Sequence, residues 1–244
     1  MKVKRVAVTT GGVRRLGRQI AYHLAGNGYR LAVIYNSSPA NEIKNTSEHL
    51  KKLPCEAKFY KCDVSDLKQL KRTIDRIGKD YKKIDLLVNN SGVINKIDFE
   101  NITQELFDKT MNVNLRAPLF TTQFALRYLI KSSDPVVINI ASLGGLLNWS
   151  GYIPYSISKS GLIKLTALLA RKLAPRIRVN AIAPGTIIID GEEDGAPEKT
   201  TIEKIPLRKY GKPKDILDAV DFILNCEYLT GQVITVDGGR AINN

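Results

Sequence analysis

The chain has 244 residues, of which 43% are hydrophobic and 25% charged, a composition typical of a globular protein. Its 37 basic and 24 acidic residues give a net charge of +13, but the basic residues are interleaved with Asp and Glu on expected helices, which argues against a nucleic-acid partner. No apolar run approaches the roughly 20 residues of a membrane span, and the first residues have too short an apolar core for a signal peptide, so we expect a cytoplasmic protein without membrane contact. Cys55, Cys62 and Cys226 lack the spacing of metal ligands, so no metal site is expected.

Strand-like runs alternate with helical periodicity along the whole chain. The pattern predicts strands at 3–9, 29–36, 56–61, 84–89, 134–142, 176–182 and 232–237. It predicts helices near 15–27, 40–52, 65–81, 103–131, 154–173 and 213–225, the fourth in two pieces that meet near Asn114. This alternation predicts an α/β fold, a doubly wound parallel sheet with helices on both faces. Because no composition break or repeat divides the chain, we expect a single domain over residues 1–244.

The first predicted strand leads into a turn that contains glycines, from Thr9 to Gly17. Glycines between a strand and a helix let the backbone approach a pyrophosphate, and the helix N-terminus offers unpaired N–H groups to it. A P-loop is the main alternative, because Gly12 and Gly17 have the required spacing. Arg18 and Gln19 then follow where a P-loop needs Lys and Ser or Thr. The turn therefore predicts a dinucleotide site.

The end of the second strand indicates which dinucleotide binds. An acidic residue there would bind the ribose hydroxyls of NAD and repel the 2′-phosphate of NADP. Here Asn36 and Ser37 end the strand, and the nearest carboxylate is Glu42. Together with Arg15 in the glycine turn, these neutral residues favour NADP. The alternative is that residues 36–39 form only a polar turn.

Further polar residues follow other strands at the same edge of the predicted sheet. Asp63 follows the third strand, where it could accept a hydrogen bond from an adenine amino group. The run 89–92, Asn-Asn-Ser-Gly, follows the fourth strand. Asn114 lies in a helical stretch without an obvious capping role, and its amide could hold a backbone carbonyl and a water molecule. Each of these residues alone indicates no more than a turn or a cap.

A hydroxyl, a phenol and an ammonium are expected to converge near the fifth strand. Ser142 lies at the carboxyl end of this strand, where open α/β sheets bind their ligands. Tyr155 and Lys159 lie four residues apart on the next predicted helix, so they project from one face. A cation beside a phenol stabilises the phenolate and helps the phenol to donate its proton to a carbonyl oxygen. Ser142 would orient that oxygen.

These residues together resemble the motifs of the short-chain dehydrogenases/reductases. The similarity covers nearly all of the chain and includes Thr10-Gly11 to Gly17, Asp63, Asn89 to Gly92, Asn114, Ser142, Tyr155, Lys159, Pro184-Gly185, Thr230-Gly231-Gln232 and Asp237-Gly238-Gly239. It implies a Rossmann-type sheet of about seven strands, hydride transfer from a nicotinamide, and a homo-oligomer that is often a tetramer.

The resemblance also implies a role for each matching residue. Tyr155 becomes the general acid/base and Ser142 orients the substrate oxygen. Lys159 lowers the pKa of Tyr155 and binds the nicotinamide ribose, while Asn114 supports a water relay. Contacts with NADP(H) are implied for Thr10, Gly11, Arg14, Arg15, Leu16, Gly17, Asn36, Ser37, Asp63, Val64, Asn90, Ser91, Gly92, Tyr155, Lys159, Pro184 and Gly185.

Two departures from the family pattern bear on the substrate. Arg15 replaces the middle glycine of the turn, as in NADPH-dependent members that include the pteridine reductases, and Ser91 stands where Ala is usual. Pteridine reductases, however, typically place Asp where this chain has Ser142, which favours an ordinary carbonyl substrate. Small ketones, sugars and steroids remain alternatives. A non-catalytic regulator that binds NADP is the alternative of another class, but such proteins usually lose the Tyr or the Lys.

Within the family, the pattern is most similar to the 3-oxoacyl-acyl-carrier-protein reductases. That similarity implies an acidic carrier protein as partner, contacted by Arg127 and Arg171, although each is equally accounted for as an exposed charge. Residues 186–210 contain Gly, Pro and an acidic cluster without periodicity, which predicts a substrate lid. The helices at 103–131 and 154–173 are apolar nearly all round, so we expect a dimer or tetramer that forms through them.

Overall fold

The computed structural model of the protein describes residues 5–189 and 199–242. Seven parallel strands form one sheet in the order β3-β2-β1-β4-β5-β6-β7. The strands are β1 (Val6–Thr10), β2 (Arg30–Tyr35), β3 (Ala57–Lys61), β4 (Leu86–Asn89), β5 (Val136–Ile140), β6 (Arg178–Pro184) and β7 (Val233–Val236). The predicted doubly wound parallel sheet is therefore confirmed, and each strand lies within three residues of its predicted bounds.

Helices follow the strands in regular alternation. They are α1 (Arg15–Gly26), α2 (Ala40–Lys51), α3 (Leu67–Tyr81), α4 (Gln104–Met111), α5 (Ala117–Leu129), α6 (Ile153–Leu173) and α7 (Pro213–Asn225). Short 3₁₀ helices lie at Phe99–Asn101, Leu143–Gly145, Ser150–Tyr152, Lys199–Lys204 and Arg240–Ile242.

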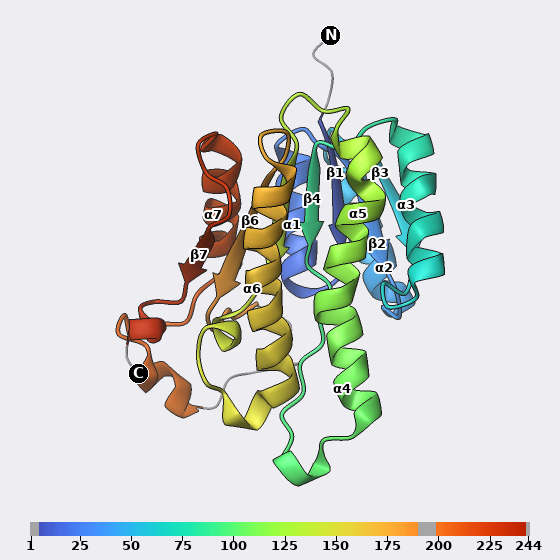
Figure 1. The fold of residues 1–244 in the computed structure, drawn as a ribbon. Coiled ribbons are helices and arrows are strands. Elements are labelled where there is room, and N and C mark those ends of the chain that lie inside the picture. The colour runs from blue at the N-terminus through green and yellow to red at the C-terminus, as the bar shows by residue number, and fades with distance from the viewer. Residues whose placement is uncertain (1–4, 190–198, 243–244) are drawn as a thin grey trace.

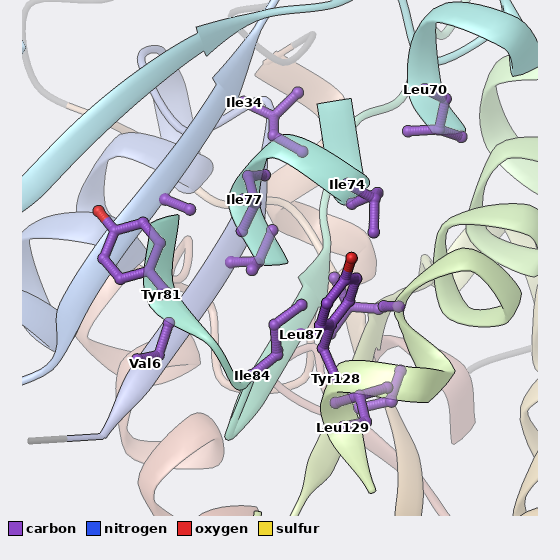
Figure 2. Packing of buried hydrophobic residues seen from close by; sticks show 14 of the residues in the cluster. Val6, Ile34, Leu70, Ile74, Ile77, Tyr81, Ile84, Leu87, Tyr128 and Leu129 are labelled. Atoms are coloured by element: carbon purple, nitrogen blue, oxygen red, sulfur yellow. The ribbon is translucent and has the colours of Figure 1, made fainter. Parts of the chain in front are cut away.

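The helices cover the sheet as two layers, with α3, α5 and α6 on one face and α1, α2 and α7 on the other (Figure 1). Successive side chains of a strand point to opposite faces, so Val6 and Val8 pack under α3 and α5 while Ala7 packs under α1. Figure 2 shows the hydrophobic core between the sheet and the layer that contains α3 and α5, where Ile74 and Ile77 of α3 pack on the strands. Burial on both faces explains why the inner strands are mostly apolar, whereas the edge strand β3 carries the exposed Lys58 and Lys61.

The helices α4 and α5 meet near Asn114, as the sequence predicts. A π-helical turn over Asn112–Arg116 joins them into one continuous element. An extra residue in a helical turn shifts the side chains that follow and is often found at functional sites. Asn114 lies in this turn and is fully buried.

The predicted lid lies partly outside the described residues, which leave out 190–198. On its two described sides the segment is fixed to the body of the protein. Ile187 forms a parallel bridge with Gly211, and Ile189 and Ile205 are buried. The lid therefore stays a prediction, but its anchor points are packed residues. No helix in the described ranges is long and apolar enough to cross a membrane.

Candidate active site

The order of the strands reverses between β1 and β4, and polar contacts join the loops that follow these two strands. The Thr10 hydroxyl accepts hydrogen bonds from the backbone N–H groups of Asn90 (2.9 Å) and Ser91 (3.0 Å). The Asn90 side chain donates in return to the Thr10 carbonyl at 2.9 Å. Ligands of open α/β sheets bind at such a reversal point. The glycine turn and the loop 89–92, which were both expected to contact a dinucleotide, are therefore joined by hydrogen bonds.

The glycine turn has the geometry of a phosphate cradle. Gly11 has a φ of +65°, and a Cβ at Gly17 would lie 2.2 Å from the Gly11 carbonyl oxygen, so both positions require glycine. Helix α1 then begins at Arg15 with no side-chain cap from Arg14 and no acidic residue in its first turn. Both arginines are exposed at this helix end. Together with the helix dipole, their charges suit a pyrophosphate or phosphate group.

The loops after β2 and β3 also come together beside this turn. Asp63 accepts hydrogen bonds from Ser65 (N–H, 2.8 Å) and from Asn36. Burial raises the pKa of Asp63, but these hydrogen bonds outweigh burial, and the pKa lies below its ordinary value. Glu42, the nearest carboxylate in sequence, is held in an ion pair with Arg18 of α1. A small hollow beside the loops is lined by Thr10, Val64, Asn89, Ser91, Val113, Ala117, Pro118 and Thr121.

Ser142 and Tyr155 meet beyond the end of β5. The strand ends at Ile140, so Ser142 lies two residues past it, where its oxygen accepts the Gly144 N–H at 3.1 Å and caps a 3₁₀ turn. Tyr155 lies in the first turn of α6 and forms a hydrogen bond with Ser142. Burial raises the pKa of Tyr155, and the contact with Ser142 only partly offsets this effect.

Lys159 lies one turn further along α6 and is 4% exposed. Its Nζ donates to the Ile140 carbonyl at 2.7 Å and lies 5.8 Å from the centre of the Tyr155 ring. Burial lowers the pKa of Lys159 to about 8. The sequence led us to expect that this lysine lowers the pKa of Tyr155, whereas in this structure the pKa of Tyr155 lies above its ordinary value. The reason is that desolvation of the phenol dominates while the ammonium is directed to Ile140.

The buried amide of Asn114 holds the loop after β4 against α6. Its oxygen accepts the Val93 N–H at 2.8 Å, and its Nδ2 donates to the Val93 carbonyl (2.9 Å) and to the Ser158 hydroxyl (3.0 Å). A Cβ at Gly92 would lie 3.4 Å from the Asn114 oxygen and 3.6 Å from the Lys159 Nζ. Asn114, Gly92 and Lys159 therefore converge, as expected from the sequence, but through contacts with Val93 and Ser158 that the sequence did not indicate.

A family model described as "Enoyl-(Acyl carrier protein) reductase" matches residues 12–241. This chain belongs to the short-chain dehydrogenase/reductase family. The 3-oxoacyl-[acyl-carrier-protein] reductase of Thermotoga maritima is 33% identical, over 98% of each chain. The human 3-oxoacyl-[acyl-carrier-protein] reductase is 31% identical over 96% of this chain and 97% of its own length. A blue fluorescent protein from a metagenomic library, solved in complex with NADPH, has a TM-score of 0.88 at 31% identity, with 97% of this chain and 98% of that chain covered.

As a short-chain dehydrogenase/reductase, the protein is an oxidoreductase that uses a nicotinamide cofactor. Some of the expected cofactor residues lie apart from the central contacts. Ser37 is exposed beyond β2, Leu16 is half-buried in α1, and Pro184 and Gly185 lie at the end of β6. Gly185 donates its N–H to the Val236 carbonyl at 2.9 Å, and a Cβ there would lie 2.8 Å from the Asp237 Cα. In this short-chain dehydrogenase/reductase a side chain at position 185 would therefore collide with Asp237, so the position requires glycine.

Sequence reasoning did not find two other features of the site. The Ile140 carbonyl binds Lys159, but a backbone atom leaves no signal in the residue type. Trp149, in the segment between Ser142 and Tyr155, lies against Gly144, where a Cβ would be 2.8 Å from the indole. A single Trp in a loop is a signal that could have been followed, because Trp is rarely left without a packing partner.

Proposed function

We propose that this short-chain dehydrogenase/reductase uses NADPH to reduce a ketone to a secondary alcohol, with a 3-oxoacyl thioester as substrate. The observation that carries the proposal is the contact between the Ser142 hydroxyl and the Tyr155 phenol, with the buried Lys159 one helical turn away. A phenol, a hydroxyl and an ammonium at one strand end suit proton transfer to a carbonyl oxygen.

Each residue then has a separate task in the reduction. The Ser142 oxygen accepts the Gly144 N–H, and its own proton, which bonds to the Tyr155 phenol in this structure, would turn to the substrate oxygen and orient it when the ketone binds. Tyr155 donates its proton to that oxygen, and a pKa above the ordinary value keeps the phenol protonated in neutral solution. Lys159, with a pKa of about 8, is mostly cationic at neutral pH and stabilises the phenolate that is left. When bound, the nicotinamide supplies the hydride.

The preference for NADPH follows from the charges around the glycine turn. Glu42 is paired with Arg18, so its carboxylate is neutralised, and Asn36 is engaged with Asp63. Arg14 and Arg15 are exposed at the start of α1, where a 2′-phosphate would benefit from their charge. The structural relative solved with NADPH adds support. A comparison of the Michaelis constants for NADPH and NADH tests this assignment, and a preference for NADH contradicts it.

The thioester assignment rests on the relatives that reduce 3-oxoacyl groups on an acyl carrier protein. An acidic carrier would bind Arg127 and Arg171. Arg171 lies about 24 Å from Tyr155 along α6, given the helical rise per residue, and Arg127 is paired with Asp75 of α3. These arginines would therefore contact the carrier protein itself and not the acyl chain at Tyr155. The double variant Arg127→Ala/Arg171→Ala should lose activity on carrier-linked chains but keep activity on a free 3-oxoacyl ester.

The decisive experiment is NADPH oxidation against a panel of 3-oxoacyl thioesters, simple ketones, sugars and pterins. We expect 3-oxoacyl thioesters to give the highest kcat/KM. A higher kcat/KM for a pterin or a sugar would identify a different carbonyl reductase of the same family. NADPH binding without turnover on any member of the panel would favour a regulator instead.

A further inference from the structure

A tryptophan and an arginine extend the candidate site toward β6 and β7. Trp149 and Tyr155 flank the same backbone position, because a Cβ at Gly144 would lie 2.8 Å from the indole Cε3 and 3.2 Å from the Tyr155 Cε1. The Trp149 ring also contacts that of Tyr152, with centroids 5.7 Å apart. The indole and the ring of the proposed proton donor therefore both border Gly144.

Arg240 covers this indole from the other end of the chain. It opens the 3₁₀ helix Arg240–Ile242 after β7, and its guanidinium carbon lies 5.3 Å from the centre of the Trp149 ring. Its Nη1 donates to the Thr186 hydroxyl at 3.2 Å. Thr186 directly follows Pro184 and Gly185 in the chain. Contacts therefore run from Trp149 to the guanidinium and on to Thr186 after β6, and Gly144 lies between Trp149 and Tyr155.

The charge of Arg240 has no acidic partner within the part of the chain that the structure describes. The nearest acid in sequence, Asp237, is occupied by the backbone N–H groups of Gly239 (2.9 Å) and Ala241 (2.7 Å). The guanidinium has five N–H groups, and among the described residues it donates to one side-chain acceptor, Thr186. A half-buried cation of this kind is stabilised when an anion binds it. Stacking on Trp149 fixes the guanidinium plane and leaves its edge for a fork-like contact with carboxylate or phosphate oxygens.

We propose that Arg240 binds a negatively charged group of the substrate, so that the preferred ketones carry a carboxylate or a phosphate near the carbonyl. The proposal rests on ketone reduction as the proposed function and departs from its thioester substrate, because a 3-oxoacyl thioester carries no charge near its carbonyl. A preference for the anionic ketones below would therefore overturn the thioester assignment while ketone reduction stands. Trp149 contributes a flat apolar surface between the carbonyl end and the charged end of such a substrate, and Arg240 selects for the charge.

Matched pairs of ketones test this selection. Acetoacetate and levulinate are each compared with their methyl esters, which keep the carbon chain and lose the charge. Dihydroxyacetone phosphate and dihydroxyacetone form the pair that distinguishes a phosphate from a carboxylate. We expect at least one anionic member to have a kcat/KM at least about tenfold above that of its neutral partner, which corresponds to about one charge-assisted hydrogen bond.

The variants Arg240→Gln and Arg240→Lys then assign the effect. Arg240→Gln should raise KM for the preferred anionic ketone about tenfold or more and change KM for its neutral partner less than about twofold. Arg240→Lys should restore part of the difference, because it keeps the charge. Lys214→Gln removes an exposed charge on α7 that is paired with Asp218, and it should change neither KM.

Two outcomes overturn the proposal while ketone reduction stands. The first is that the wild-type protein reduces the neutral ketones at least as well as the anionic ones. The second is that Arg240→Gln lowers kcat/KM equally for both ketones of a pair, which would mean that Arg240 only holds Trp149 in position. If the wild-type protein reduces no ketone of either kind with NADPH or NADH, the proposed function fails and this inference fails with it.

Discussion

At the scale of single residues, the candidate site is a set of polar groups at the end of a parallel strand. Ser142 and Tyr155 are in hydrogen-bond contact although different elements supply them: the 3₁₀ turn after β5 and the first turn of α6. Lys159 reaches the same place because a spacing of four residues returns to one helix face. Removing a single polar atom from one of these side chains should therefore change the activity of the site.

Removing the phenol oxygen tests the proposed proton donor. Tyr155→Phe keeps the ring beside Gly144 and deletes the acid, so kcat should fall by about 10² to 10⁴-fold, the range for a lost general acid. NADPH binding, followed by quenching of protein fluorescence, should stay within about threefold of the wild-type value. Full turnover by this variant would show that another group donates the proton.

The buried lysine is expected to reduce the stability of the fold. Burial lowers the pKa of Lys159 from 10.5 to about 8. At neutral pH this shift lowers the free energy of unfolding by about 3 kcal/mol. This figure does not include the contribution of the hydrogen bond to Ile140. Lys159→Met should therefore raise the free energy of unfolding at pH 7 by about 1–2 kcal/mol after loss of about one hydrogen bond, while turnover falls strongly.

The pH dependence of this effect has a defined sign. Between the folded pKa of about 8 and the ordinary lysine pKa of 10.5, the unfolded chain binds the lysine proton more readily than the folded protein does. The wild-type protein should therefore gain stability relative to Lys159→Met as pH rises through this window. Urea unfolding of both proteins at pH 7 and near pH 10 measures the change. Lys164→Met, at an exposed position of the same helix, is the control and should show no such trend.

At the scale of elements, the turn between β1 and α1 combines a backbone requirement with a charge. Arg15 has a φ of +48°, a left-handed conformation that a side chain makes unfavourable. Strain of this kind is often found at ligand-binding sites, although Lys82 shows it as well. At Arg15 we infer that it places the side chain for the proposed contact with the cofactor phosphate.

Replacing Arg15 with glycine separates strain from binding. Arg15→Gly should stabilise the protein by about 1 kcal/mol and raise KM for NADPH about tenfold, the loss of about one charge-assisted contact, with KM for NADH nearly unchanged. Lys82→Gly is a matched control, because Lys82 has a φ of +71° at the end of α3. It should give a similar gain in stability without a change in either KM. An unchanged preference for NADPH in Arg15→Gly would contradict the role of Arg15.

At the scale of the whole molecule, α5 and α6 carry apolar side chains on the side that faces away from the sheet. Leu119 and Ile130 of the α5 segment and Ile157 and Leu168 of α6 are between 36% and 55% exposed. Each pair lies about three turns apart, so each forms a stripe along one side of its helix. The two helices cover the same face of the sheet (Figure 1). Apolar stripes of this kind are typical of subunit interfaces.

A charge placed in these stripes should weaken the proposed oligomer. Leu168→Glu adds a carboxylate at a position that is already half exposed, so the fold should be kept while the mass in solution falls toward that of the 27.1 kDa chain. Sedimentation velocity at micromolar protein measures the mass. Asn45→Glu, at an exposed position of α2 on the opposite face of the sheet, adds the same charge and should leave the mass unchanged. A wild-type protein that is already monomeric would contradict the proposed interface.

The sequence by itself determined the elements and their order. Mostly apolar runs such as Val136 to Ile140, which includes the buried Asn139, are typical of strands that are covered on both faces. The glycine turn was equally legible, because only glycine fits where backbone atoms approach within 2.2 Å of a Cβ position. Local patterns of this kind record local constraints.

Only the tertiary structure decided how distant residues meet. The π-helical turn that buries Asn114, the carbonyl of Ile140 that binds Lys159 and the stacking of Arg240 on Trp149 join segments far apart in the chain. The direction of the Tyr155 pKa is the clearest case, because spacing indicates that a cation is near but not how much water the phenol has lost. Desolvation depends on everything packed around a group, and one sequence position does not contain that information.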